Sequence, residues 1–338
     1  MRRFLIAIAL LLGILFIIGH FAEVQSIWET LRKGDWRFIS LSILVELLWL
    51  INLGATYRAI YHALGIDDSL RRLTYLALAA NFTNVVAPSV GVSGMAVFIS
   101  EARKTNLPSG KVTLAGILFL LLDYAAFLCV LTLGLFVLFR RNDLNAPEII
   151  ASLILFVLAL GLGAMIYIGM RSSLALGKIL AWIAHQVNRI LHPLLHRDYL
   201  SEKRAFDFSN EVAEGLTVLR ENPRNLLIPF IHTLLNKLLL VLILFLIFVA
   251  FKAPLSIGTI IAGWSMGYLF MIISPTPAGI GFVEGAMTLT ISSFYVTLSA
   301  ATILSLAYRG VTFWLPLLFG FIAFRSLENL IKPNLTNS

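Results

Sequence analysis

The sequence has little charge for its length. Of its 338 residues, 13% are Asp, Glu, Lys or Arg, whereas a soluble domain carries about 25%. Hydrophobic residues make up 59% of the chain, and the mean hydropathy is +0.90. This composition excludes an ordinary soluble domain and predicts an integral membrane protein.

Cysteine and the common catalytic motifs are also scarce. The single cysteine, Cys129, excludes an internal disulfide. The chain has no GxxxxGK[ST] loop, which argues against ATP as a direct energy source, and no HExxH or GxSxG motif. No nucleic-acid-binding module is visible. We therefore expect no enzyme activity, no cofactor and no nucleic-acid partner.

Long apolar runs recur along the whole chain, and runs near or above about 20 residues suit bilayer-spanning helices. Strand-like alternation is absent. The first run follows Arg2 and Arg3 and is longer than the apolar region of a signal peptide, so we expect a retained anchor. The eight candidate segments are residues 4–22, 38–64, 73–87, 112–139, 149–170, 226–251, 257–273 and 300–324.

The net charge of +8 carries topological information. A cytoplasmic N-terminus places most of the 26 Lys and Arg residues inside, as the positive-inside rule requires. This arrangement works when segments 73–87 and 257–273 are halves of re-entrant hairpins. We expect one polytopic domain over residues 1–338 in the cell (inner) membrane, with both termini in the cytoplasm.

The only long polar stretch, residues 171–224, is expected to be a cytoplasmic amphipathic insertion. Apolar residues recur at helical spacing over residues 176–194, with Trp182 beside them, which is typical of a helix on a membrane surface. A second helix is predicted over residues 205–219.

Two histidines in this insertion have the spacing of a metal site. His192 and His196 are four residues apart, but Pro193 lies between them and Asp198 is off their helical face. We interpret them as interfacial polar residues and expect no metal.

The segment SPTPAGIGFVEG, residues 274–285, interrupts an apolar helix. Two prolines and three glycines surround Glu284. Proline removes a backbone donor and glycine permits sharp turns. Within hydrocarbon, irregular backbone survives only where protein covers it or where it borders a wet cavity. The break therefore predicts a transporter binding site.

A weaker copy of this break lies in the first half of the chain. APSVGVSG, residues 87–94, matches SPTPAGIG, residues 274–281, in its second-position proline and last glycine. Asp123 follows the first break at nearly the distance at which Arg309 follows the second. Together with the predicted topology, the match indicates two inverted repeats, each with a re-entrant broken-helix hairpin, in an all-α membrane protein.

Each break is expected to place a helix N-terminus near mid-membrane. Facing N-termini offer free amides and partial positive charge to an anion such as a phosphate. Ser93 is a candidate cap for the first helix, and Thr276 a candidate lining residue at the second. Alternatively, the glycines serve only close helix packing; these are Gly91, Gly94, Gly279, Gly281 and Gly285.

Charges within apolar segments are costly and indicate function by default. Asp123 and Arg309 either pair with each other, or Arg309 binds a lipid phosphate. Glu284 either stabilises its helix N-terminus or carries a proton or a cationic headgroup. The charges within or beside the spans are Glu46, Asp123, Lys237, Glu284 and Arg309, with Glu101, Arg103 and Lys104 after the first break.

Two motifs carry a resemblance to a known family. PTPAGIGFVEGAM, residues 275–287, and AYRGVTFWLPLLFG, residues 307–320, resemble the membrane domain shared by lysylphosphatidylglycerol synthetases and related standalone flippase-like proteins. GVSG, residues 91–94, and LLDY, residues 121–124, resemble its first-half signature. The resemblance spans roughly residues 5–327. Family members more often have two glycines where this chain has Ala278 and Gly279.

The soluble aminoacyl-transferase domain of the full synthetases is not part of this sequence, so the resemblance implies lipid translocation without synthesis. It names no lipid: lysylphosphatidylglycerol, another phospholipid, a polyprenyl-phosphate sugar and a hopanoid-type lipid all stay open. The alternatives are a secondary transporter of a small solute and a membrane-embedded lipid transferase or its scaffold. The sequence also leaves open a homo-oligomer.

We therefore expect a flippase that moves an anionic or amphiphilic membrane lipid between leaflets. Its predicted substrate-binding residues are Pro88, Gly91, Ser93, Gly94, Glu101, Arg103, Asp123, Pro275, Thr276, Pro277, Gly279, Gly281, Glu284, Tyr308 and Arg309.

Overall fold

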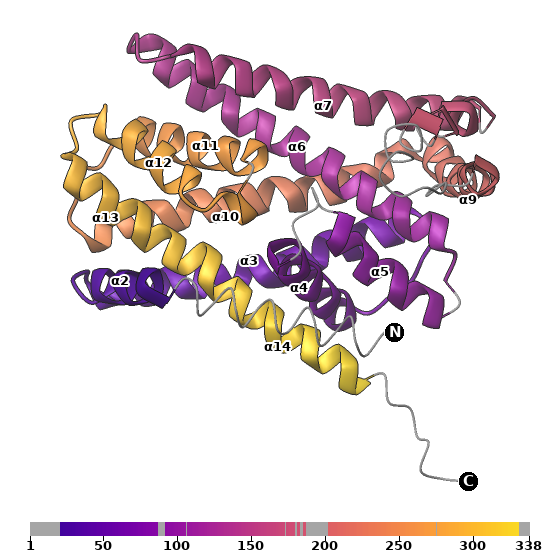
Figure 1. Ribbon diagram of the computed structural model, residues 1–338, viewed down its shortest axis with the longest axis horizontal. Coiled ribbons are helices and arrows are strands. Elements are labelled where there is room, and N and C mark those ends of the chain that lie inside the picture. The colour runs from indigo at the N-terminus through magenta and orange to yellow at the C-terminus, as the bar shows by residue number, and fades with distance from the viewer. Residues whose placement is uncertain are drawn as a thin grey trace.

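The computed structural model describes residues 21–86, 92–105, 107–172, 174–179, 181–182, 185–186, 202–274 and 276–330. The described residues form helices joined by short loops (Figure 1). Nearly all of the first apolar run lies outside them, as do Pro88, Gly91, Pro275, His192 and His196.

The helices follow one element order in each half of the chain. A long helix precedes a pair of short helices, and another long helix follows the pair. In the first half these are α3 (Trp36–Ala63), α4 (Leu70–Val86), α5 (Val92–Lys104) and α6 (Ser109–Arg140). In the second half they are α10 (Leu227–Ala250), α11 (Ile257–Ile273), α12 (Phe282–Ser292) and α13 (Leu298–Arg309), which continues through the π-helical turn η3 (Gly310–Trp314) into α14 (Leu315–Leu330).

The remaining elements surround these repeats: α2 (Phe21–Leu31), α7 (Ala146–Arg171), α9 (Glu202–Glu221) and the 3-10 turns η1 (Pro223–Leu226) and η2 (Pro277–Gly279). Among the described residues, five helices are long and apolar enough to cross a membrane, and α11 is a shorter apolar helix. The predicted helix over residues 205–219 is confirmed as α9. The parts of the preceding amphipathic segment that the structure describes are helical, with Trp182 exposed.

Local signals set several of the helix starts. The Asp35 carboxylate accepts from the amide of Arg37 at the start of α3. The Glu148 carboxylate accepts from the amide of Asn145 before α7, where Pro147 occupies the first turn. The Thr297 hydroxyl accepts from the amide of Ala300 at the start of α13.

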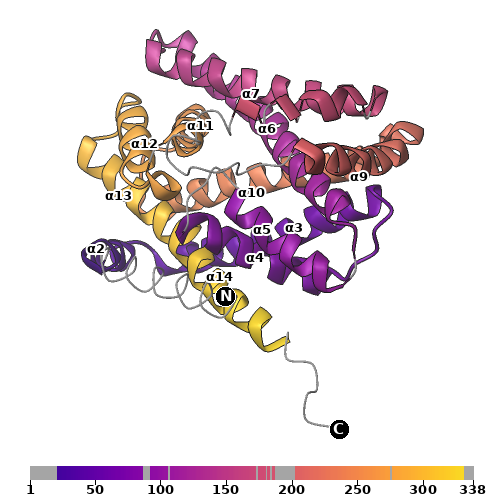
Figure 2. The same cartoon turned by 45° about the vertical axis from the view of Figure 1, so that its right-hand side comes forward.

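The two halves pack reciprocally. The α3 and α10 helices lie antiparallel and form the largest helix contact; α4 packs against α14 as α11 packs against α6. In both views α10 lies between the two short-helix pairs (Figures 1 and 2). This exchange of equivalent contacts between halves supports the predicted repeat, whereas re-entry of the hairpins into a membrane stays a prediction.

Asparagines join α3 to α10 in an otherwise apolar interface. The Asn52 side chain donates to the Asn236 side-chain oxygen (2.8 Å) and to the carbonyl of His232 (2.9 Å). The Asn236 amide donates to the Thr56 hydroxyl (3.2 Å). In lipid there is no strong hydrophobic driving force between helices. Hydrogen bonds between them therefore fix the register of the pair.

Each short-helix pair is an antiparallel hairpin. A Cβ atom at Gly263 would lie 2.7 Å from the Ile291 side chain, and one at Gly267 would lie 2.4 Å from Met287. These glycines therefore allow α11 and α12 to approach closely. By contrast, a Cβ at Gly281 or Gly285 would meet no atom within 4 Å, so the packing role considered for those two glycines is wrong.

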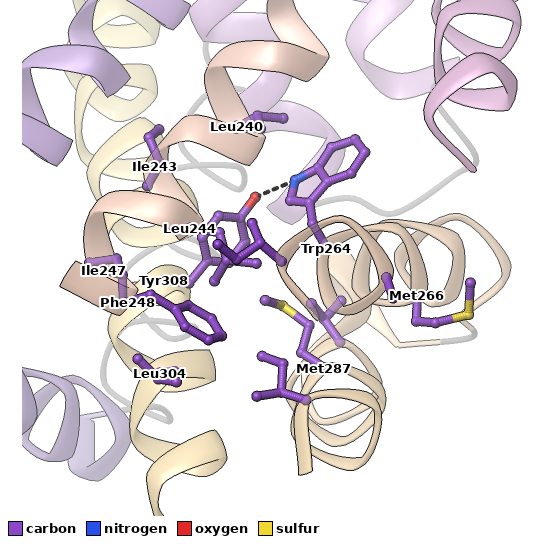
Figure 3. Close-up of a cluster of buried hydrophobic side chains, with 14 of the residues drawn as sticks. Leu240, Ile243, Leu244, Ile247, Phe248, Trp264, Met266, Met287, Leu304 and Tyr308 are labelled. Atoms are coloured by element: carbon purple, nitrogen blue, oxygen red, sulfur yellow. Dashed lines mark hydrogen bonds between the residues drawn. The ribbon is translucent and has the colours of Figure 1, made fainter. Parts of the chain in front are cut away.

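The apolar core lies where the second-half helices meet. Ile243 and Leu244 of α10, Met287 of α12, Leu304 of α13 and Trp264 of α11 all belong to this cluster (Figure 3). A second cluster joins α3, α4, α6 and α9. The α7 helix lies along one edge of the molecule and exposes most of its apolar residues, as a lipid-facing helix does (Figure 1).

Candidate functional site

A cavity of about 330 Å³ lies between the tips of the two hairpins. Asn81, Asn84 and Val85 of the first hairpin line one side, and Ala278 and Val283 of the second line another. The tips also touch each other, since Val85 and Ala278 belong to one apolar cluster. The described residues that flank the two breaks thus meet at a single site.

The first buried ion pair at the cavity joins α6 to α10. The Lys237 ammonium donates to Asp123 Oδ1 (2.6 Å) and also bonds the Tyr268 hydroxyl, and that hydroxyl donates to Asp123 Oδ2 (3.0 Å). The Lys237 side chain is 2% exposed. Both charges are therefore held by a partner, as charges within an apolar region must be.

The second ion pair joins α13 to the tip of the second hairpin. Arg309 donates through Nε to Glu284 Oε1 (2.7 Å) and through Nη2 to the carbonyl of Ala278 (3.0 Å). The other Glu284 oxygen accepts from the amide of Gly281 (2.7 Å) at the start of α12. One carboxylate therefore stabilises the helix N-terminus, as considered for Glu284, and neutralises an arginine.

Of the two alternatives left open for Asp123 and Arg309, the one in which they pair with each other is wrong. Asp123 is held by Lys237 and Tyr268, and Arg309 by Glu284. Both residues nevertheless line the same cavity, together with Tyr308. The repeat places the two charges at related positions, and each takes its partner from the helix packed beside it.

At the helix N-termini beside the breaks, backbone amides donate to side chains of the protein itself. The amide of Gly94 and the hydroxyl of Ser93 both donate to Asn84 Oδ1, at 2.7 and 3.0 Å. The α5 helix is thus capped by Asn84 from α4, where the sequence suggested Ser93. Thr276 bonds Ser274 and the carbonyl of Ile280, inside the break itself.

Several predicted site residues lie away from the cavity. Glu101 pairs with Arg72 and Lys104 at the far end of α5, and Arg103 is exposed there. Thr276, Gly279 and Gly281 support the break but are not among the lining residues, and Pro277 begins η2. Gly94 lines a smaller adjoining pocket that shares Tyr57, Asn84 and Phe119 with the main cavity.

Ala278 has a left-handed backbone conformation, with φ 51° and ψ 22°. This is the position where the resemblance leads one to expect a glycine, and a Cβ there costs roughly 1–2 kcal/mol. Gly279 and Gly281 also have positive φ, at 73° and 83°. The chain tolerates the strained alanine because Arg309 bonds its carbonyl and the tip of the first hairpin packs against it.

The two cations at the cavity keep hydrogen-bond donors that the described residues do not use. Arg309 uses two of the five guanidinium N–H groups on protein partners in the described part of the chain. Both oxygens of Asp123 and both of Glu284, in contrast, are already bonded. A ligand entering this cavity therefore meets spare donors on Arg309 and Lys237, which favours an anionic group.

Sequence reasoning missed part of this site. Lys237 stood among the intramembrane charges but not among the expected binding residues, although its position within an apolar segment was a sufficient signal. Tyr268, Trp264 and Asn84 carried no such signal, because an aromatic or an asparagine within a helix is common. Only the fold brings these side chains to the cavity.

Comparisons with known proteins agree with this architecture. The family model described as "Lysylphosphatidylglycerol synthase TM region" matches residues 4–320. A protein named "UPF0104 membrane protein" from Methanothermobacter thermautotrophicus is 23% identical over 314 residues, covering 92% of this chain and 90% of its own. Another UPF0104 membrane protein, from Methanocaldococcus jannaschii, is 22% identical over 325 residues, covering 94% and 93%.

Proposed function

Because the chain belongs to the lysylphosphatidylglycerol synthase TM region family, we propose that it moves a lipid with an anionic headgroup between the leaflets of a membrane. The observation that carries this proposal is the cavity between the hairpin tips. It is bordered by two buried cations, Lys237 and Arg309, that keep spare hydrogen-bond donors.

The size of the cavity supports a headgroup as its occupant. Pockets for small molecules occupy about 300–1,000 Å³, and this one holds about 330 Å³. That volume accommodates a phosphate-bearing headgroup but not two acyl chains. In this proposal the chains stay in the bilayer while the headgroup crosses through the cavity, and no covalent chemistry is involved.

The phosphate would be bound chiefly by Arg309. Its planar guanidinium matches phosphate oxygens, and the contact with Glu284 orients it while leaving other N–H groups free. The Arg309 guanidinium also lies over the Phe313 ring, 4.4 Å from its centroid, which restricts its motion. A prepositioned guanidinium costs less ordering entropy when the headgroup arrives.

A leaflet-exchange assay in proteoliposomes tests the proposal. Fluorescent phosphatidylglycerol should equilibrate between leaflets faster with the protein than in empty vesicles, and a fluorescent diacylglycerol should show no protein-dependent gain. Equal rates with and without protein for every labelled phospholipid would overturn lipid translocation. Mass spectrometry of lipids that co-purify with the protein identifies the natural headgroup.

To test the role of Arg309, the variant must not leave the Glu284 carboxylate unpaired. Arg309→Ala combined with Glu284→Gln removes the guanidinium and the charge that it neutralises. Loss of a charge-assisted hydrogen bond is worth about 1.5–3 kcal/mol, so phosphatidylglycerol transport should fall about ten- to a hundred-fold. Glu284→Gln alone is the matched control, since glutamine still accepts from the amide of Gly281. If both variants transport alike, Arg309 does not bind the headgroup.

A further inference from the structure

Glu46 is a buried carboxyl group that the lipid-binding cavity does not use. It lies within α3 and has no exposed surface, and neither carboxyl oxygen has a hydrogen-bond partner among the residues that the structure describes. Every other carboxylate near the cavity, on Asp123 and Glu284, is paired with a cation. An isolated ionised carboxylate in such a place is very costly, so Glu46 carries its proton in this conformation.

The position of Glu46 links it to the cavity. It lies on the same face of α3 as Trp49 and Leu53, which are three and seven residues further along and line the cavity. Tyr308 of α13 also lines the cavity, and the π-helical turn that follows α13 packs against α3. The Tyr308 hydroxyl accepts from the Trp264 indole (2.9 Å), as Figure 3 shows.

The groups around Glu46 leave it few partners. The helix α10 runs antiparallel to α3 and presents apolar residues such as Leu240 and Ile243 at this level. On α13 the titratable groups at the cavity are Tyr308 and Arg309, and Arg309 is held by Glu284. The Lys237–Asp123 pair also lies at the cavity, and Tyr268 bonds both of its members. On α4, Tyr75 belongs to an apolar cluster with Leu47 and Trp49 of α3.

We infer that Glu46 is a proton-binding site that couples lipid movement to proton transfer across the membrane, an inference that rests on the proposed function. The carboxyl group takes up a proton from one side of the membrane and releases it to the other side as the headgroup crosses. A metal cation is a poorer occupant, since it requires about six oxygen ligands and the described residues offer no cluster of three acidic or histidine side chains.

The structure also contains an element through which the proton would act. Release of the proton creates a negative charge on α3. In this proposal that charge attracts the Arg309 guanidinium and weakens its bonds to Glu284 and Ala278 at the tip of the second hairpin. The π-helical turn η3 follows Arg309 directly and packs against α3; such turns are frequent at functional sites.

Infrared spectroscopy tests the proton site without any lipid probe. In purified protein at neutral pH, the C=O stretch of a neutral carboxylic acid should be present, shift in D₂O, and disappear in Glu46→Gln. Glu221→Gln, which removes an exposed carboxylate, should leave the band in place. Identical carboxyl bands in wild type and Glu46→Gln would overturn the proton site. If Glu46→Gln fails to fold, Glu46→Asp must move the band.

Coupling is tested in proteoliposomes with fluorescent phosphatidylglycerol and an imposed pH gradient. The gradient should change the rate of leaflet exchange in wild type and in Glu221→Gln, and this difference should be lost in Glu46→Gln. The coupling is overturned if the pH gradient does not change the rate of leaflet exchange in wild type, or if its effect persists in Glu46→Gln. If wild type moves no labelled lipid, the proposed function and the coupling fail together, while the infrared band still decides whether Glu46 holds a proton.

Discussion

Buried charged residues at the cavity act in pairs, one of which joins the two halves while the other lies within the second half. Lys237 of the second repeat holds Asp123 of the first, over 114 positions in sequence. Arg309 holds the tip of its own hairpin through Glu284 and Ala278. Removal of one partner from a buried pair is more damaging than removal of both, because a lone charge is left in an apolar surrounding.

This asymmetry predicts the outcome of a double-mutant cycle. Lys237→Met should destabilise the protein by about 3–5 kcal/mol, because Asp123 is left uncompensated. Adding Asp123→Leu should recover most of that stability while transport of anionic lipid stays low. Unfolding in mixed micelles measures the free energies. A cycle on Asp123 and Arg309 is the control, and coupling there as strong as between Asp123 and Lys237 would contradict the pairing.

Ala278 supplies a second prediction at this scale. Ala278→Gly relieves the left-handed strain and should raise the unfolding free energy by about 1 kcal/mol. Lys252, in the loop after α10, has nearly the same φ of 52° and lies outside the site. Lys252→Gly should therefore give a similar gain. A loss of stability in Ala278→Gly would mean that its methyl contacts at the hairpin tips outweigh the strain.

At the scale of helices, the hairpins depend on small residues at their contact faces. Each hairpin is short for a bilayer span, and its stability comes from packing on its own second helix and on a long helix of the other half. In lipid such packing replaces the hydrophobic driving force that soluble helices have. The α11–α12 contact is the tightest example, since Gly263 and Gly267 face Ile291 and Met287 directly.

Two glycines of this hairpin should respond oppositely to the same substitution. Gly267→Ala places a methyl group 2.4 Å from Met287 and should cost about 1–3 kcal/mol. Gly285→Ala adds a methyl group into open space within α12 and should stabilise the helix by about 0.8–1 kcal/mol. The two variants are compared by their thermal unfolding, measured as the fraction of monodisperse protein that remains after heating. Equal effects would refute the assigned contact face.

At the scale of the whole molecule, the ends of the helices separate by charge. The turn between α6 and α7 and the helix α2 lie at one end of the molecule, and α9 lies at the other (Figure 1). Among the described residues, most lysines and arginines of the loops belong to the α9 end, and the positive-inside rule therefore predicts that this end faces the cytoplasm. The exposed apolar face of α7 spans the distance between the two ends.

Cysteine labelling tests this orientation. In a Cys129→Ala background, Asn145→Cys should react with an impermeant maleimide from outside the cell, and Glu221→Cys should react only after permeabilisation. Both residues are exposed, so accessibility within the protein does not limit either reaction. The reverse pattern would invert the topology and, with it, the leaflet from which each hairpin enters.

The sequence by itself determined the membrane class, the positions of the apolar helices, the two breaks and the family, and all of these are local properties. Hydropathy sums over neighbouring residues, and proline and glycine act on the backbone where they stand. Glu284 at the start of α12 also followed from local chemistry, because an acidic residue in the first turn bonds the free amides there. The repeat was also visible, because it is detected when a motif in one half of the chain is compared with a similar motif in the other half.

Only the tertiary structure decided which charges pair and which residues reach the cavity. Asp123 pairs with Lys237 and not with Arg309 because α6 packs beside α10. Which helix lies beside α6 depends on how the two halves of the molecule pack together. Asn84, not Ser93, caps α5 because the α4–α5 hairpin brings the Asn84 side-chain oxygen within 2.7 Å of the Gly94 amide nitrogen, from which it accepts a hydrogen bond. Contacts between residues distant in sequence depend on interhelical packing, and hydropathy, which is similar on several faces of an apolar helix, does not specify them.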